Sequence, residues 1–221
     1  MPHLDERLKK VAQQIRATTH VDIGSDHAHL LVALLRSGRV EKGIAIENKR
    51  QPLSHSQQAL LGLNAEARFA DGLEGLLVGE ADSLSICGMG AESIVSILER
   101  SPERIPDFVV LQPNRRPDLI RRWGFANGFH LVDEQVAFGH WPYVILSYRK
   151  RSGREVDPAF QQIDHQADLL FGPWLLQRRE PEFVALLREE QDYWQQFRQI
   201  SETSLERRDA IERVLKRWSD L

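Results

Sequence analysis

The sequence has little of several residues that define whole classes of protein. Among its 221 residues only Cys87 is a cysteine, which excludes an internal disulfide framework and a cysteine-based zinc site. Its apolar runs are short, as at residues 30–35, so no segment is long enough to cross a bilayer. The first residues lack the apolar stretch and cleavage site of a signal peptide. We therefore expect a cytoplasmic protein without a membrane anchor.

Charge of one sign is not in excess either. The formal net charge is −3, which argues against a histone-like nucleic-acid binder but leaves room for local basic patches. Hydrophobic residues make up 42% of the chain and charged residues 28%, as in globular proteins with a sizeable core. A chain of this length suits one medium domain with a smaller appendage.

Short apolar strands alternate with helical segments through most of the chain. An amphipathic helix over residues 4–15 comes first. The expected strands then cover residues 20–23, 43–47, 67–70, 83–87 and 108–112. The expected helices between and after them cover residues 28–37, 52–63, 91–100 and 117–127. This alternation predicts a mostly parallel sheet with helices on both faces.

The alternation ends after residue 129. Strands at 130–138 and 143–150 are separated by only four residues, 139–142, too few for a crossover helix. They must therefore form an antiparallel hairpin at the edge of the sheet. A seven-stranded sheet that closes on such a hairpin is typical of Rossmann-like class I methyltransferases, whereas dehydrogenase sheets usually stay parallel. We expect this α/β fold over residues 1–155.

The remaining residues, 156–221, show no strand pattern. Neither glycine nor proline occurs after residue 181, and apolar residues recur there at spacings of three and four. This narrow stripe is typical of coiled-coil-like packing. Its members are Phe183, Leu187, Trp194, Phe197, Ile200, Leu205, Ile211, Leu215 and Trp218. We expect a helical hairpin with a turn at residues 201–204 and Ser204 as the N-cap of the last helix; one continuous helix is the alternative.

Residues 22–28, Asp-Ile-Gly-Ser-Asp-His-Ala, lie where the first expected strand meets the next helix. Gly24 permits a close backbone approach, and the helix N-terminus offers free N–H groups. The further glycines of a dinucleotide-binding loop are missing. Asp22 and Asp26 would repel a pyrophosphate but suit the sulfonium and amino groups of S-adenosylmethionine. The segment favours this methyl donor over NAD; the alternative is an ordinary turn with Ser25 or Asp26 as an N-cap.

Polar groups also follow the second and third expected strands. Glu47 ends the second strand, where a carboxylate can accept hydrogen bonds from both ribose hydroxyls of an adenosine. Asp71 and Gly72 follow the third, where a carboxylate and a backbone N–H can bind the adenine edge; an Asp-Gly turn is the alternative. Both segments suit an adenosine, but Glu47 serves NAD and S-adenosylmethionine equally and so does not decide between these cofactors.

The fourth and fifth expected strands end in a similar way. Cys87 is followed by glycines at 88 and 90, which leave space for the methionine part of the donor, and we expect Cys87 to be a small apolar residue rather than a nucleophile. Gln112, Pro113 and Asn114 carry amide groups that can hydrogen-bond a planar base. Each segment alone is equally a turn, but all five lie at carboxyl ends of strands, where open α/β sheets bind ligands.

Five motifs in this order resemble those of the bacterial tRNA (adenine-22, N1)-methyltransferase family, TrmK. They are the segment at 22–28, Ala-Asp-Gly-Leu at 70–73, Gly-Met-Gly at 88–90, Leu-Gln-Pro-Asn at 111–114 and Phe-Gly-Pro-Trp-Leu-Leu at 171–176. The resemblance runs from about residue 4 to the end of the chain. Departures at Leu31, Cys87 and Ala91, where members often have proline, alanine and glycine, remove no polar group.

The resemblance implies transfer of a methyl group from S-adenosylmethionine to N1 of adenosine 22 in tRNA. It implies that residues 1–155 bind the donor and that the hairpin at 156–221 clamps the tRNA. A small-molecule methyltransferase on the same fold and a non-catalytic RNA-binding protein are the alternatives. The expected donor-binding residues are Asp22, Gly24, Asp26, His27, Glu47, Asn48, Asp71, Gly72, Leu73, Cys87, Gly88, Met89 and Gln112.

Attack by adenine N1 places a positive charge on the base, which a carboxylate or amide oxygen would stabilise. Asp26 and Asn114 are the expected catalytic residues, on the assumption that the first and fifth segments lie beside each other. No metal is expected, because His27 and His29 stand two apart at a helix start and should diverge.

Two further groups of side chains are candidates for contact with RNA. Trp141, Pro142 and Tyr143 in the hairpin are either a platform for a base or edge packing, with packing favoured. Phosphate contacts are possible for Arg115, Arg116, Arg121, Arg122, Arg149, Lys150, Arg151 and Arg154. The residue after Asn114 is Arg115 rather than an aromatic, so the partner that stacks on the target base must come from elsewhere.

Overall fold

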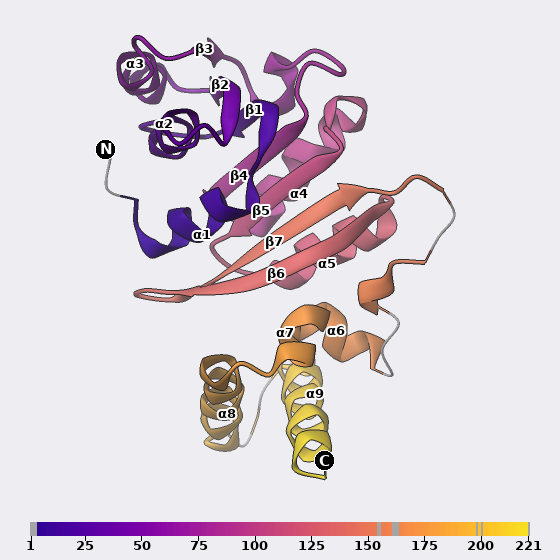
Figure 1. The fold of residues 1–221 in the computed structure, drawn as a ribbon. Helices are drawn as coiled ribbons and strands as arrows, with labels where there is room; N and C mark the ends of the chain where they lie inside the picture. The colour runs from indigo at the N-terminus through magenta and orange to yellow at the C-terminus, as the bar shows by residue number, and fades with distance from the viewer. Residues whose placement is uncertain (1–3, 154–155, 161–163, 198, 200, 221) are drawn as a thin grey trace. The chain divides into compact units, whose positions relative to one another are not determined.

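The computed structural model of the chain describes residues 4–153, 156–160, 164–197, 199 and 201–220. Contacts within the chain divide it into two compact units, Met1–Glu155 and Val156–Leu221 (Figure 1).

A seven-stranded sheet in the order β3-β2-β1-β4-β5-β7-β6 forms the centre of the first unit. Its strands are β1 (Ala17–Ile23), β2 (Val40–Glu47), β3 (Ala65–Phe69), β4 (Ser83–Met89), β5 (Phe108–Pro113), β6 (Phe129–Phe138) and β7 (Pro142–Lys150). The first five are parallel, whereas β6 and β7 form an antiparallel hairpin in which β7 pairs with β5. The predicted fold class is therefore confirmed.

Helices cover both faces of this sheet (Figure 1). They are α1 (Glu6–Gln14), α2 (His29–Arg36), α3 (Arg50–Ala59), α4 (Ala91–Arg100) and α5 (Pro117–Ala126), with short 3-10 turns at Gly72–Gly75 and Pro102–Arg104. On one face, Val11 of α1 and Leu34 of α2 pack in one core cluster with Val110 of β5. The helices α4 and α5 contact each other and β5.

The N-terminal helix α1 is stabilised by a cap at its first turn and by buried apolar residues toward its end. Asp5 caps it, because the Asp5 side chain accepts a hydrogen bond from the backbone N–H of Leu8 at 2.7 Å. Val11 and Ile15 are fully buried against the sheet. The helix contacts β5, and the side chain of Arg7 reaches Gln112 near the carboxyl end of that strand.

The second unit is helical throughout its described residues. Its α-helices are α6 (His165–Phe171), α7 (Pro173–Arg178), α8 (Pro181–Gln195) and α9 (Glu202–Ser219), preceded by a 3-10 turn at Pro158–Phe160. The helices α8 and α9 pack against each other, so the expected pair of helices, rather than one continuous helix, is confirmed.

Two details of this unit differ from the sequence prediction. The N-cap of α9 is Ser201, not Ser204: the Ser201 hydroxyl accepts the N–H of Ser204, three residues into the helix, as an N-cap side chain does. The apolar stripe is also only partly buried. Phe183 and Ile211 lie in the core, whereas Phe197 is exposed because it follows the end of α8, and Ile200 lies outside the described residues.

None of the helices in the described residues is both long and apolar enough to span a membrane.

Candidate active site

Two cavities open at the carboxyl ends of the parallel strands. The first has a volume of about 540 Å³ and includes Gly24, Asn48, Asp71, Gly72 and Met89 in its lining. The second has a volume of about 370 Å³ and includes Asp22, Gly24, Asp26, His27, Cys87 and Gly88. The structure thus brings most of the predicted site residues to two neighbouring cavities that share Gly24. Glu47, Leu73, Gln112 and Asn114 line neither cavity.

The first cavity holds a polar cluster around Asp71. Arg100 Nη1 lies 2.5 Å from Asp71 Oδ2, and Asn48 Nδ2 donates to Asp71 Oδ1 at 3.4 Å. The hydrogen bond from Arg100 holds the pKa of Asp71 below its ordinary value. Gly72 next to it has φ +59°, and a Cβ there would lie 2.8 Å from Ile97, so the turn requires glycine. A charged carboxylate and a tight glycine turn therefore form one wall of this cavity.

Gly24 lies between the two cavities. Its φ is +71°, and a Cβ at this position would lie only 2.1 Å from the Cε of Met89. The Met89 side chain at the end of β4 thus packs directly over the backbone of the β1–α2 loop. A side chain at position 24 would therefore collide with Met89, and the close approach of a ligand to Gly24 stays a prediction.

Glu47 is buried behind this loop. Its Oε1 accepts hydrogen bonds from Ser25 Oγ at 2.9 Å and from the backbone N–H of Asp26 at 2.5 Å. Ser56 of α3 adds a hydrogen bond to the carbonyl of Asp26 at 3.3 Å. These contacts fix the loop that carries Asp26, whose own φ is +53°. In this structure Glu47 therefore orders the β1–α2 loop from beneath.

Asp22 is the buried carboxylate of the second cavity. Its Oδ1 accepts a hydrogen bond from Ser85 Oγ at 2.6 Å. Burial raises the pKa of Asp22 to about 7 and the charge of Glu47 adds to this, against the Ser85 hydrogen bond and the positive charge of Arg7, which lower it. A cation bound in the cavity would stabilise the ionised carboxylate. Burial also raises the pKa of the neighbouring Cys87 thiol, which fits a small apolar role.

Arg7 of α1 is a site residue that the sequence analysis missed. Its Nη1 lies 2.5 Å from Gln112 Oε1, and its guanidinium lies 5.7 Å from the centre of the Tyr143 ring. It also lines the second cavity. One signal was available: Arg7 stands four residues before Val11 and next to Leu8, on the apolar face of the helix. A charged residue on that face needs a partner.

Gln112 and Asn114 have different surroundings. Gln112 is fully buried, and its Oε1 also accepts the N–H of Gly88 at 3.1 Å while its Nε2 donates to the carbonyl of Pro113 at 2.9 Å. Asn114 is exposed, and its Nδ2 donates to the carbonyl of Gly88 at 2.7 Å. Because Nδ2 makes this hydrogen bond, Oδ1 is the atom of the Asn114 amide that can accept a hydrogen bond from a ligand.

The expectation that the first and fifth segments lie beside each other is wrong. β4 pairs with both β1 and β5 and so lies between them. Asp26 and Asn114 therefore lie on opposite sides of the end of β4. Asp26 lines the second cavity, whereas Asn114 is hydrogen-bonded to Gly88, which lines it. The sequence could not show this, because strand order is set by tertiary pairing.

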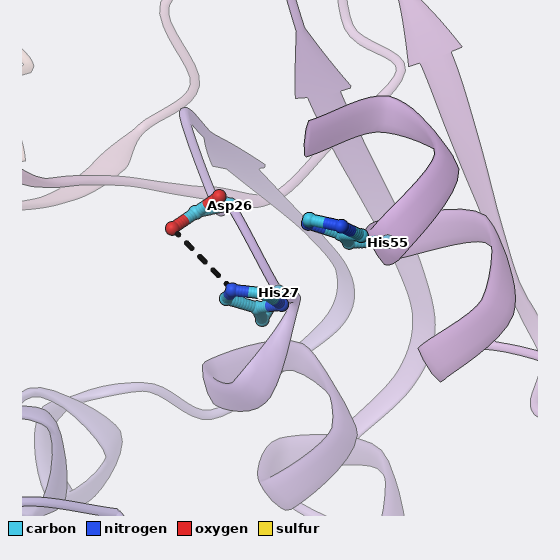
Figure 2. A group of neighbouring side chains, drawn as sticks. All are labelled: Asp26, His27 and His55. Atoms are coloured by element: carbon cyan, nitrogen blue, oxygen red, sulfur yellow. Dashed lines mark ion pairs between the residues drawn. The ribbon is translucent and has the colours of Figure 1, made fainter. Parts of the chain in front are cut away.

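Three side chains that could each offer one metal ligand atom gather beside the loop (Figure 2). They are Asp26, His27 and His55, and their ligand atoms lie within 4.8 Å of one another. The His27 ring, however, stacks on His55 with centres 4.5 Å apart and planes 10° apart. Imidazole binds a metal through a lone pair in the ring plane, and two nearly parallel planes do not meet at one ion. This arrangement is a ring stack rather than a chelate.

The expected divergence of His27 and His29 is also wrong. Their rings are stacked with centres 5.4 Å apart, because Ala28 between them has φ +50° and turns both side chains to one side.

The basic clusters are not all free to contact phosphate. Arg121 is completely buried and its Nε lies 2.6 Å from Oε1 of Glu134, so its assignment as a phosphate contact is wrong. Arg116 forms two 3.0 Å hydrogen bonds to Asp118. Arg115 and Arg122 are exposed, and Arg154 lies outside the described residues.

The preference for edge packing in the hairpin is wrong for one residue. Trp141 is 69% exposed at the tip, whereas Tyr143 is half-buried and packs against the cluster of α1 and β5. Trp141 is the last of three turn residues, 139–141, which lie beyond the paired part of the hairpin that ends at Phe138 and Pro142.

The strand order and the paired cavities at the carboxyl edge define a Rossmann-like methyltransferase domain. A sequence model of the family TrmK, tRNA (adenine(22)-N(1))-methyltransferase, matches residues 20–218. The tRNA (adenine(22)-N(1))-methyltransferase of Bacillus subtilis (strain 168) is 30% identical over 209 residues, 91% of this chain and 87% of the relative. The chain therefore belongs to the TrmK family of S-adenosylmethionine-dependent tRNA (adenine-N1)-methyltransferases, as its motifs predicted.

Solved structures of related methyltransferases have a similar fold. The crystal structure of the B. subtilis m1A22 tRNA methyltransferase TrmK matches with a TM-score of 0.82 and 27% identity, over 98% of this chain and 99% of that one. A Streptococcus pneumoniae relative in complex with S-adenosyl-L-methionine matches with a TM-score of 0.84 and 26% identity, over 96% and 100%.

Proposed function

We propose that the chain methylates N1 of adenosine 22 in tRNA. The adenosine part of the donor occupies the first cavity, and its methionine part, with the amino group toward Asp22, meets the target base at the second. The observation that carries this assignment is the pair of cavities that meet at Gly24, one walled by Asp71 and the other by Asp22. The complex of the S. pneumoniae relative with S-adenosyl-L-methionine supports the choice of donor. When bound, S-adenosylmethionine supplies a methyl group on a positively charged sulfur.

The residues present fit such a donor. Asp71 and Asn48 offer hydrogen-bonding groups in the first cavity, next to the apolar side chains of Ile46 and Ile97. Glu47 lies at the end of β2, and in the described residues its Oε2 makes no hydrogen bond, so this oxygen remains as the acceptor for a ribose hydroxyl. Asp22 is a buried carboxylate that an amino group would stabilise.

Asn114 and Asp26 act on the target base. Adenine N1 carries a free lone pair at neutral pH, so no strong base is needed and positioning accounts for much of the rate. Oδ1 of Asn114 accepts a hydrogen bond from the N6 amine, and this bond strengthens as the ring becomes cationic. The exposed carboxylate of Asp26 stabilises the same charge. Since N1 lies on the pairing edge, the base must leave its pair before it enters the site.

The helical unit at 156–221 binds the tRNA. In the described residues, α8 and α9 have a core of their own, which includes Phe183, Leu187 and Ile211. A groove on this unit is lined by Arg179, Arg188, Lys216 and Trp218, and also by Asp192 and Glu212. Arginine, lysine and an aromatic ring are the groups that contact phosphates and bases.

Mass spectrometry of tRNA nucleosides tests the function directly. Incubation of the full chain with tRNA and S-adenosylmethionine should produce N1-methyladenosine. A tRNA with guanosine at position 22 should gain none. A protein that binds the donor but leaves adenosine 22 unmodified would contradict the proposal and would favour a small-molecule substrate.

Single-turnover kinetics tests the role of Asn114. Asn114→Ala should slow methyl transfer by about 10²- to 10³-fold, because one preorganised contact to the developing charge is lost. Donor affinity should stay within about a few-fold, since the residue lines neither cavity. Asn64→Ala is the matched control: Asn64 Nδ2 also donates to a backbone carbonyl at 2.7 Å, far from the site at the start of β3. Parallel loss of rate and melting temperature in Asn114→Ala would show a structural role instead.

A further inference from the structure

Four polar side chains form a continuous, buried series of hydrogen bonds between β1 and β4, called the hydrogen-bond chain below. Ser83 Oγ lies 2.7 Å from His20 Nδ1, His20 Nε2 lies 2.9 Å from Ser85 Oγ, and Ser85 Oγ lies 2.6 Å from Asp22 Oδ1. The register explains the alignment, because His20 pairs with Ser83 and Asp22 with Ser85 across the two parallel strands. All four side chains are buried. The chain ends at the carboxylate that lines the second cavity.

Hydrogen-bond accounting fixes the direction of this chain. An ionised Asp22 can only accept hydrogen bonds, so Ser85 donates its single hydroxyl hydrogen to Asp22. Ser85 must then accept from His20, which places the imidazole proton on Nε2 and leaves Nδ1 to accept from Ser83. Burial lowers the pKa of His20 to about 3, so the ring stays neutral. Every hydrogen in the chain therefore points toward Asp22.

We propose that His20, through Ser85, is a positioning residue that keeps Asp22 ionised and so determines the pH range in which the enzyme binds its cationic donor. The proposal rests on the function proposed above, in which Asp22 faces the amino group of the donor. A serine hydroxyl that receives a hydrogen bond from an imidazole is polarised and donates more strongly to its own acceptor. Without this donation the carboxylate would lose part of the stabilisation that opposes its burial.

The remaining charges around Asp22 do not explain its ionisation by themselves. Arg7 of α1 favours the charged form, and Glu47 of β2 opposes it. Cys87 of β4 is neutral, because burial raises its pKa. The other titratable residues in the same cavity are Asp5, Asp26, His27 and His29. All of these groups are unchanged in a His20 or Ser85 variant. A difference in the pH dependence of binding between variant and wild type therefore reports on the hydrogen-bond chain alone.

The test is calorimetric titration of the full chain with S-adenosylhomocysteine between pH 6 and pH 9. Ser85→Ala should raise the pKa of Asp22 by about one unit. From a wild-type pKa of about 7, binding should then be about ninefold weaker at pH 6 and about fivefold weaker at pH 7. The deficit should shrink toward pH 9, where Asp22 is ionised in both proteins. His20→Leu should show a smaller shift in the same direction, and His20→Gln, whose amide can still donate to Ser85, should restore most of the affinity.

Controls separate this role from a general loss of structure. Ser147→Ala removes another buried serine of the same sheet, on β7, and should leave the pH profile unchanged. A deficit that stays constant from pH 6 to pH 9 would overturn the proposal, because lost packing does not depend on the ionisation of Asp22. If Asp22→Asn weakens binding but the His20 and Ser85 variants do not, only the role of His20 is refuted. If Asp22→Asn binds normally, the proposed donor contact fails as well.

Nitrogen-15 NMR gives a second readout that does not involve the ligand. At pH 8 the His20 ring, assigned by its absence from the His20→Leu spectrum, should be neutral with its proton on Nε2. A proton on Nδ1 at that pH would reverse the direction of the chain and would overturn the proposal.

Discussion

Replacement of Glu47 by alanine should weaken donor binding through two separate effects. The first is the loss of Oε2 as an acceptor for the ribose. The second is the loss of Oε1, which accepts from Ser25 at 2.9 Å and from the N–H of Asp26 at 2.5 Å and so orders the loop that passes Gly24. A hydrogen bond to a charged group contributes about 1.5–3 kcal/mol, so one lost ribose contact corresponds to roughly 10- to 150-fold in affinity.

The loop effect should be smaller and should appear in the melting temperature. The N–H of Asp26 lies near solvent and can bind water after the substitution, so we expect a loss of about 1 kcal/mol of stability for the hydrogen bonds of the loop. Glu41→Ala is the matched control, because Glu41 is an exposed glutamate of the same strand. Glu47→Gln keeps an acceptor oxygen for the loop and removes the charge, so it should restore stability more than affinity.

Calorimetric titration with S-adenosylhomocysteine, together with thermal melting, measures both effects. Unchanged affinity in a folded Glu47→Ala protein would refute the ribose assignment. An affinity loss that Glu47→Gln restores completely would show that the loop contact, not the charge, carries the binding.

One truncation and two substitutions provide further tests. Truncation after residue 155 should leave donor affinity within about two-fold and strongly weaken tRNA binding in a filter assay; a full rate of tRNA methylation would contradict the clamp. Arg121→Ala should lower stability by about 3–5 kcal/mol in denaturant unfolding, because it removes one side of the buried ion pair with Glu134. The control Arg122→Ala, at an exposed position, should change stability by less than about 0.5 kcal/mol. Arg7→Ala should raise the pKa of Asp22 above about 7 and weaken donor binding at neutral pH; a pH profile of binding identical to that of wild type would exclude this contact.

The fold could be predicted from the local pattern of apolar residues and from the lengths of the connections between strands. Four residues between the last two strands leave no room for a helix, so the hairpin followed from the length of the connection. The site motifs were found for a similar reason, since each directly follows a strand. Nearly all lie at the carboxyl edge, where parallel strands must end together.

Three features of the site and core could not be predicted from the sequence, because each depends on contacts between elements that are distant along the chain. Arg7 reaches Gln112 across 105 positions in sequence, because α1 packs against β5 and β7. His20 and Asp22 share one face of β1, and Ser83 and Ser85 share one face of β4, but their contact requires the knowledge that β1 pairs with β4. Arg121 stood in a cluster of arginines that looked solvated, and only the position of β6 shows that it is buried.

In the proposed site, the β1–α2 loop would connect the donor to the reacting base through the buried carboxylate of Glu47. Asp26 and Ala28 both have positive φ, a conformation that costs a non-glycine residue of order 1 kcal/mol or more. The hydrogen bonds of Glu47 and Ser56 to the backbone of Asp26 offset that cost and fix the position of this residue. Since the other oxygen of Glu47 is the proposed ribose contact, a bound donor would hold Glu47, and through it the loop, in the conformation that places Asp26 beside the second cavity. Donor binding would then assist the correct placement of the base, because Asp26 would already lie where the developing positive charge needs it.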